Sequence, residues 1–363
     1  MAGIGRFLVS KLINTFVTLI VAVLFISVIF AAYSIHEKRG FVEEEFVVMA
    51  KYFEREYKDP VKLQKALEEL KKEIMRKYGL TGNTYRDVLR EVLSLIKSSL
   101  TFDFGHSRGQ YFGTTDVGEQ VKIALRNTMI LFTTATLINT VIGIFLGVRI
   151  ARRPGSLADR VVSVMGMVSW SLPIWWIGII FLIIFSFYLG WFPVQAKDVY
   201  IALQRVPEGV SGFGLFVYKL KTWLYYMSLP LATIVLVSFG GWTYVVRNLV
   251  AEVLSQDFVQ AARARGLPER RIIYGHVLRT SSPPIVTSVA LALVGSFGGA
   301  IITEAVFGWP GTGLLYWVAL LNGEARIVMA TTYVLAVVFI IAILVIDLLY
   351  FILDPRVRVE AAR

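Results

Sequence analysis

The sequence predicts an all-α membrane protein with six transmembrane helices. Apolar residues make up 56% of the 363 positions and the mean hydropathy is +0.64, whereas a soluble domain has about 45–50% apolar residues. The polar connections are alternately basic and close to neutral, which is typical of a chain that crosses a bilayer repeatedly. Six stretches are apolar enough to cross about 30 Å of hydrocarbon, and they cover residues 7–33, 121–148, 161–190, 229–250, 285–305 and 327–349.

The composition excludes several classes of protein. The chain contains no cysteine, and its three histidines (His36, His106 and His276) are far apart, so we expect no disulfide, no metal site and no cofactor in this chain. No G-x-x-x-x-G-K-[ST] segment and no nucleophile–base set occurs, so we do not expect an enzyme. The net charge of +11 is concentrated in particular loops, so we assign it to membrane topology and expect no nucleic-acid partner.

Charge also predicts the orientation. The segment 35–119 carries 15 Lys and Arg against 15 Asp and Glu, whereas residues 149–160, residues 247–279 and the C-terminal tail are rich in arginine. Basic loops remain in the cytoplasm, so we expect a multi-pass plasma-membrane protein with both termini inside. The predicted domains are an N-terminal transmembrane helix (1–34), an extracytoplasmic helical segment (35–119), a five-helix membrane core (120–353) with a cytoplasmic loop at 251–282, and a cytoplasmic tail (354–363).

The extracytoplasmic segment predicts two amphipathic helices. One begins after Asp59-Pro60 and ends at Gly79, and the second is "TYRDVLREVLSLIKSSL". They form either a scaffold or a docking surface for an external partner. The first span has no small-x-small cleavage site, so we interpret it as an uncleaved helix rather than a signal peptide.

Polar and helix-breaking residues mark candidate sites within the membrane core. Ser169, Ser171 and Pro173 predict a kink in the third span, with hydroxyls facing either the bundle or a transport pathway. Glu304 is either paired or pathway-facing. "FGWPGTG" followed by the short apolar "LLYWVALL" predicts a tight loop or a re-entrant loop, and we favour an outer gate made by Trp309, Pro310, Gly311 and Gly313.

The loop "QDFVQAARARGLPERR" predicts two short helices joined by a sharp break. Ser255 or Gln256 can cap a helix that starts at Asp257. Gly266 provides the positive φ that ends it, and Pro268 suits the first turn of the next helix. Ser281-Ser282-Pro283-Pro284 is expected to end that second helix. The face formed by Phe258, Ala261, Ala262 and Arg265 fits a protein partner, and the arginines equally fit an anionic membrane surface.

Four blocks resemble the B-type permease of dipeptide/oligopeptide ABC importers. "FVQAARARGL" with "ERRIIYGHVLR" is similar to the EAA loop of that family, and "SLPIWWIGIIFLIIFSFYLGWFP", "TEAVFGWPGTG" and "DLLYFILDPR" are similar to its other signatures in the same order. Gln260 replaces the glutamate of the motif, and the segment after the first span lacks the usual Pro-Gly-Asp-Pro stretch.

The resemblance implies a type I ABC-importer permease fold. It implies three kinds of partner besides membrane lipid: a second permease subunit, two cytoplasmic ATPases that bind ATP and Mg²⁺, and an extracytoplasmic solute-binding protein. It also implies ATPase coupling through residues 257–266, namely Asp257, Phe258, Gln260, Ala261, Ala262, Arg263, Arg265 and Gly266. The cargo is either a peptide or an oligosaccharide. The alternatives outside this class are an ion-coupled carrier and a membrane scaffold that transports nothing.

Overall fold

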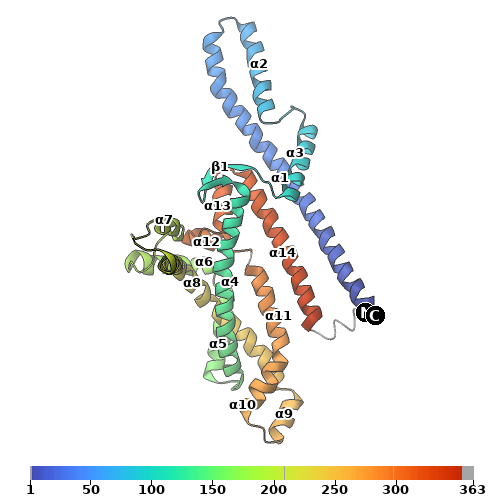
Figure 1. Ribbon diagram of the computed structural model, residues 1–363, viewed down its shortest axis with the longest axis vertical. Helices are drawn as coiled ribbons and strands as arrows, with labels where there is room; N and C mark the ends of the chain where they lie inside the picture. The colour runs from blue at the N-terminus through green and yellow to red at the C-terminus, as the bar shows by residue number, and fades with distance from the viewer. Residues whose placement is uncertain (1, 208, 297, 354–363) are drawn as a thin grey trace. The chain divides into compact units, whose positions relative to one another are not determined.

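The computed structural model describes residues 2–207, 209–296 and 298–353. These residues fold almost entirely into helices (Figure 1). The long apolar ones are α1 (Ala2–Glu56), α4 (Val117–Ala151), α8 (Gly212–Leu254), α11 (Leu278–Ser296) and α14 (Ala325–Leu353). The helices α5 (Leu157–Ser171) and α6 (Ile174–Phe181), the latter extended by the π-helix η1 (Leu182–Tyr188), form a pair bent by 93°.

The predicted number of six spans agrees with this arrangement. Within the described ranges, five helices are long and apolar enough to cross a membrane, and the bent pair makes a sixth if it counts as one span. The bend lies at Leu172-Pro173, between the two predicted serines and the apolar "IWWIGIIF". Pro173 provides no N–H for the preceding helix, so the break occurs where the sequence predicts a kink.

Two predicted boundaries are wrong. The fifth span ends at Ser296, and Ile301–Phe307 forms a separate helix, α12, instead of continuing that span to residue 305. Pro283 and Pro284 do not end the helix that precedes them, because both lie inside α11. The Ser282 hydroxyl donates a hydrogen bond to the Arg279 carbonyl at 2.8 Å, which replaces the backbone donor that Pro283 lacks.

The chain divides into two compact units, which we describe separately. The first contains residues 1–13, 123–317 and 338–363. Within it, α5 packs along α8, and the Arg247 side chain of α8 binds Asp159 of α5 through two contacts, Nε to Oδ1 at 2.7 Å and Nη2 to Oδ2 at 2.8 Å. The paired, planar geometry makes this a strong contact between two helices. In the same unit, Asp347 binds Lys11 at 2.7 Å.

The second unit contains residues 14–122 and 318–337. α1 continues as a helix to Glu56, well beyond its apolar stretch, and α2 (Pro60–Lys77) runs back beside it (Figure 1). The contacts of Lys71 with Glu43 and of Lys77 with Glu45 join the two helices. Asp59 caps α2 by accepting from the Val61 N–H at 2.9 Å, as the sequence predicts.

A short β-hairpin in this unit was not predicted from the sequence. β1 (His106–Tyr111) pairs antiparallel with β2 (Thr114–Asp116) after α3 (Thr84–Thr101). The Glu324 carboxylate, just before α14, accepts from the backbone N–H groups of Arg108 at 3.0 Å and Gly109 at 2.8 Å. This contact joins the hairpin to the start of α14.

Candidate functional site

The first candidate site is the polar loop between α8 and α11. α9 (Asp257–Ala264) is followed by a break, by the single turn α10 (Glu269–Arg271) and by the π-helix η3 (Ile272–Val277). Asp257 lies in the first turn of α9, where its negative charge interacts favourably with the positive end of the helix dipole. Gln256 occupies the N-cap position without a side-chain hydrogen bond, and the Ser255 hydroxyl donates to Glu252 O instead.

The break at Gly266 follows from backbone geometry. Gly266 has a φ of +76°, which a side-chain-bearing residue adopts only with strain. The Arg263 guanidinium, on α9, binds Glu269 of α10 across this break, with Nη2 and Oε1 2.9 Å apart. The hydrogen bond that Arg263 donates to Glu269 raises the pKa of Arg263 and lowers the pKa of Glu269, so it favours the charged form of both groups.

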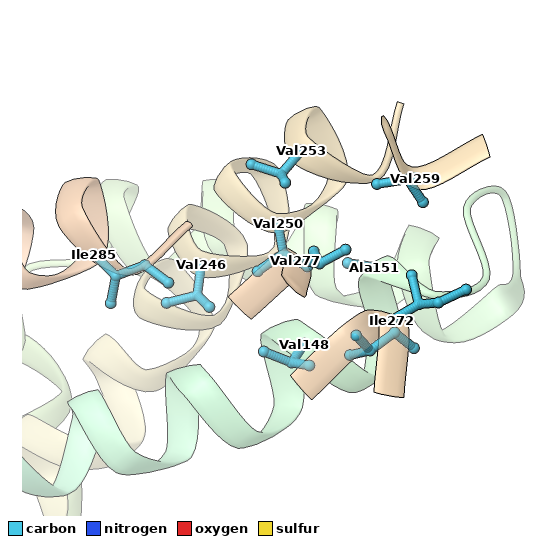
Figure 2. Packing of buried hydrophobic residues seen from close by; sticks show 10 residues of the cluster. Val148, Ala151, Val246, Val250, Val253, Val259, Ile272, Val277 and Ile285 are labelled. Atoms are coloured by element: carbon cyan, nitrogen blue, oxygen red, sulfur yellow. The ribbon is translucent and has the colours of Figure 1, made fainter. Parts of the chain in front are cut away.

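A buried apolar cluster holds α9 against the ends of α4 and α8 (Figure 2). Val259 contributes from α9 and Ile272 from η3, and both are fully buried. The cluster consists of Val148, Ala151, Val246, Val250, Val253, Val259, Ile272, Ile273, Val277 and Ile285. Each buried valine or isoleucine contributes about 1.5–3 kcal/mol when it leaves water, so burial of Val259 attaches α9 to the ends of the spans.

The opposite face of α9 is exposed. Phe258 is 39% exposed, and Ala261 and Arg265 are also exposed. Ala262 differs from the expectation because it is half-buried and packs against the apolar cluster. Of the remaining predicted coupling residues, Asp257, Gln260, Arg263 and Gly266 are exposed as well.

The second candidate site is the loop between α12 and α13 (Thr312–Leu321), which contains Trp309–Gly313. Glu304 of α12 is completely buried. Its Oε2 accepts from the N–H of Gly313 at 2.7 Å and of Leu314 at 3.2 Å, and its Oε1 accepts from the Thr128 hydroxyl of α4 at 2.8 Å. The carboxylate therefore caps the first turn of α13 and ties it to α4.

The rest of this loop is also fixed by α4. The Asn127 side-chain amide donates to the Pro310 carbonyl at 2.7 Å, and the Trp309 indole N–H donates to the Asn127 carbonyl at 3.1 Å. Trp309 is fully buried, and its ring lies edge-on to Trp223 with centroids 5.7 Å apart. At Gly311, a β-carbon would come within 2.4 Å of Glu304 Oε2, so only glycine fits there.

Sequence reasoning missed Asn127 and Thr128, which lie among the residues of the second apolar stretch. The one feature of the sequence that could have identified them is that they are polar residues within a span. Such residues usually have a structural or functional partner, but the sequence does not show which residue that partner is.

A cavity of about 450 Å³ lies within the first unit. It is lined by hydroxyl, indole and apolar groups, namely those of Ser169, Trp170, Ser238, Trp242, Val245, Ser288 and Leu291, together with Gly241. The Trp170 ring lies edge-on to Tyr244 at 5.9 Å. None of these eight described lining residues is charged.

The three predicted pathway residues are not brought together. Ser169 lines the cavity. Ser171 is exposed and its hydroxyl donates to the Met167 carbonyl of its own helix, whereas Glu304 is buried in the α12–α13 loop. A pathway role for any of them stays a prediction.

The long apolar helices, the bent third span and the polar loop attached to α8 and α11 define a multi-pass α-helical membrane protein. A comparison with known protein families identifies the class to which the chain belongs. Residues 139–359 match the family described as the binding-protein-dependent transport system inner membrane component. The chain belongs to this family, the transmembrane permease subunits of ABC importers, and within it to the dipeptide/oligopeptide permease B type.

Individual relatives support this assignment. The chain is 31% identical over 276 residues to the oligopeptide transport system permease protein OppB of Mycobacterium bovis, covering 76% of this chain and 82% of the relative. It is 28% identical over 291 residues to the oligopeptide transport system permease protein AppB of Bacillus subtilis, covering 79% and 85%. It is 28% identical over 298 residues to the di/tripeptide transport system permease protein DppB of Pseudomonas aeruginosa, covering 79% and 84%.

Proposed function

We propose that this chain is one transmembrane subunit of an ATP-driven peptide importer, with α9 as the coupling helix for a cytoplasmic ATPase. The observation that carries the proposal is the two-sided character of α9. Val259 is buried in the apolar cluster, whereas Phe258 and Ala261 on the other side are exposed. When a partner displaces a helix that is anchored in this way, the spans packed against its buried side are displaced with it.

The surface of α9 suits a groove on a partner protein. Phe258 is an exposed aromatic side chain of the type that anchors interfaces. The small side chain of Ala261 allows a partner backbone to approach closely. A partner ATPase that moves α9 would therefore move the inner ends of α4, α8 and α11, which contribute Val148, Val253 and Ile285 to the same cluster.

The remaining parts of the proposal come from the family. Two ATPases bind ATP and Mg²⁺, a second permease forms the other half of the pathway, and a solute-binding protein delivers the cargo to the outer side. The arginine-rich 247–279 loop and both termini lie in the cytoplasm. We propose Trp309–Gly313 as part of the outer gate, and the cavity that contains Ser169 as part of the pathway.

Peptide is the favoured cargo because the relatives named above are described as oligopeptide and di/tripeptide permeases. Uptake of labelled tripeptides and of labelled oligosaccharides by proteoliposomes that contain the whole transporter would decide between them, and oligosaccharide uptake without peptide uptake would overturn the cargo assignment.

The coupling role is tested by comparing Phe258→Ala with Tyr274→Ala in the assembled transporter. Tyr274 is a matched control because it is an aromatic residue on η3 in the same loop and is 55% exposed. We expect Phe258→Ala to weaken ATPase binding by at least tenfold, equivalent to about 1.4 kcal/mol, and to reduce ATP-dependent uptake, with little effect of Tyr274→Ala. Equal, normal binding and uptake in both variants would refute the assignment of α9.

A further inference from the structure

The helix α3 (Thr84–Thr101) has one face that is covered by protein and is mostly polar, and another that is apolar and uncovered. The covered face contains Asp87, Glu91, Leu95 and Ser99 at intervals of four residues. Asp87, Leu95 and Ser99 are buried and the Glu91 side chain is only 14% exposed. The uncovered face is formed by Tyr85, Leu89, Leu93 and Leu100, all of them exposed, and by the half-buried Ile96.

The two faces lie on nearly opposite sides of the helix. At about 100° per residue, the exposed apolar stripe is centred about 140° from the buried row. A basic edge runs along one side of the stripe. Arg86, Arg90 and Lys97 each follow a stripe residue by one position, and all three are exposed.

Contacts with α1 place α3 at the level where the first span leaves the apolar layer. The apolar stretch of α1 ends at Tyr33. The next residue, Ser34, donates to Glu91 of α3 at 2.7 Å, and Lys38 binds the same carboxylate. The start of α3 lies beside Arg39, whose guanidinium donates to the Thr84 hydroxyl at 2.9 Å.

At the C-terminal end of α3, the contacts lie deeper in the apolar layer. Phe102, which follows α3 directly, has its ring 5.7 Å from that of Tyr333 on α14. Tyr333 is eight residues after Ala325, where the apolar helix begins, and this corresponds to about 12 Å along its axis at 1.5 Å per residue. The last turn of α3 is therefore at the depth of the hydrocarbon layer, and its first turn is at the depth of the headgroups.

We infer that α3 is an interfacial helix whose stripe of Tyr85, Leu89, Leu93, Ile96 and Leu100 is inserted into the phospholipid bilayer on the side of the 35–119 segment. Such a helix has an apolar face in the acyl region and basic residues beside the phosphates. The depth of its contacts and the position of Arg86 and Arg90 near its first turn both fit this partner, and the long side chain of Lys97 can extend its ammonium group toward the headgroups. This inference depends only on membrane insertion of the chain, and not on the proposed transport function.

The absence of cysteine allows a direct test on the full chain. Single-cysteine variants Leu93→Cys and Leu100→Cys, carrying a nitroxide, are reconstituted into nanodiscs of phosphatidylcholine and phosphatidylglycerol. Collision rates with oxygen, which concentrates in lipid, and with a water-soluble nickel chelate are then measured. Val61→Cys is the matched control, because Val61 lies on α2 and is 66% exposed, as is Leu100.

We expect oxygen collisions to exceed nickel collisions at Leu93 and Leu100, and the reverse at Val61. Nickel accessibility at Leu93 and Leu100 equal to that at Val61 would overturn the inference. So would protection from both reagents, which indicates a protein partner on the stripe. If either labelled variant fails to fold, Leu89→Cys, at a stripe position that is 62% exposed, is labelled and measured in the same way; nickel accessibility there equal to that at Val61 also contradicts the inference.

Discussion

Replacement of Glu304 should open the loop between α12 and α13. In Glu304→Ala, the N–H groups of Gly313 and Leu314 lose their buried acceptor, whereas the Thr128 hydroxyl can turn to the Thr312 hydroxyl 3.0 Å away. A buried donor left without a partner costs about 1–3 kcal/mol, so two such donors cost roughly 2–6 kcal/mol. This cost applies to the closed form of the loop and should favour its local opening.

Glu304→Gln is the matched control. Its carbonyl oxygen can accept from Gly313 and Leu314, and its amide group can donate to the Thr128 hydroxyl, so the closed loop keeps its hydrogen bonds. Hydrogen exchange of a peptide that covers residues 309–315 measures the opening. Because about 1.4 kcal/mol corresponds to a factor of ten, we expect exchange to accelerate at least about 25-fold in the alanine variant and less than tenfold in the glutamine variant.

Unchanged exchange in Glu304→Ala would refute the reasoning, because it would mean that the carboxylate does not hold the loop. Equal acceleration in both variants would also refute it, because the glutamine variant retains an acceptor for the two backbone groups.

Three further predictions concern the rest of the chain. Arg247→Lys should lower the unfolding temperature in detergent although the charge is kept, because lysine cannot make both contacts with Asp159; an unchanged unfolding temperature would contradict this role. Gly266→Ala should destabilise the loop by about 1 kcal/mol through its positive φ, seen as faster proteolysis after Arg265, whereas the same rate as the native chain would argue against strain. Burial by itself raises the pKa of Asp87. The hydrogen bonds from the Thr81 hydroxyl and from backbone N–H groups together lower it by more than burial raises it, so the pKa of Asp87 is below the ordinary value. Its stabilising effect is therefore present above about pH 4 and is lost as the pH falls through the lowered pKa, and the difference in unfolding temperature between the native chain and Asp87→Asn should shrink between pH 7 and pH 3; a constant difference would contradict it.

The sequence predicted the membrane spans because length and apolarity determine them almost alone. It also predicted the bend at Pro173 and the positive φ at Gly266, since proline and glycine restrict the backbone wherever they occur. The helix from Pro60 was predicted for the same kind of local reason, since Asp59 supplies its cap.

One error has a local cause and the others arose from distant contacts. Pro283 was expected to end a helix, but the hydroxyl of the adjacent Ser282 supplies the missing donor. The hairpin at 106–116 is held by Glu324, more than 200 residues later. Glu304 is tied to α4 by a hydrogen bond from the hydroxyl of Thr128, 176 residues away in the sequence. Neither the Arg108–Glu324 pair nor the Thr128–Glu304 pair has a spacing that a single sequence reveals.

We propose above all that the exposed face of α9 contacts a cytoplasmic ATPase. The most direct measurement is cross-linking of the assembled transporter, using the natural absence of cysteine in this chain. Ala261→Cys, with a thiol introduced in turn along the surface groove of an ATPase subunit free of other reactive cysteines, should give a disulfide-linked permease–ATPase pair, whereas Tyr274→Cys should give little. The absence of any cross-link from Ala261→Cys in a complex that hydrolyses ATP and imports peptide would contradict the account.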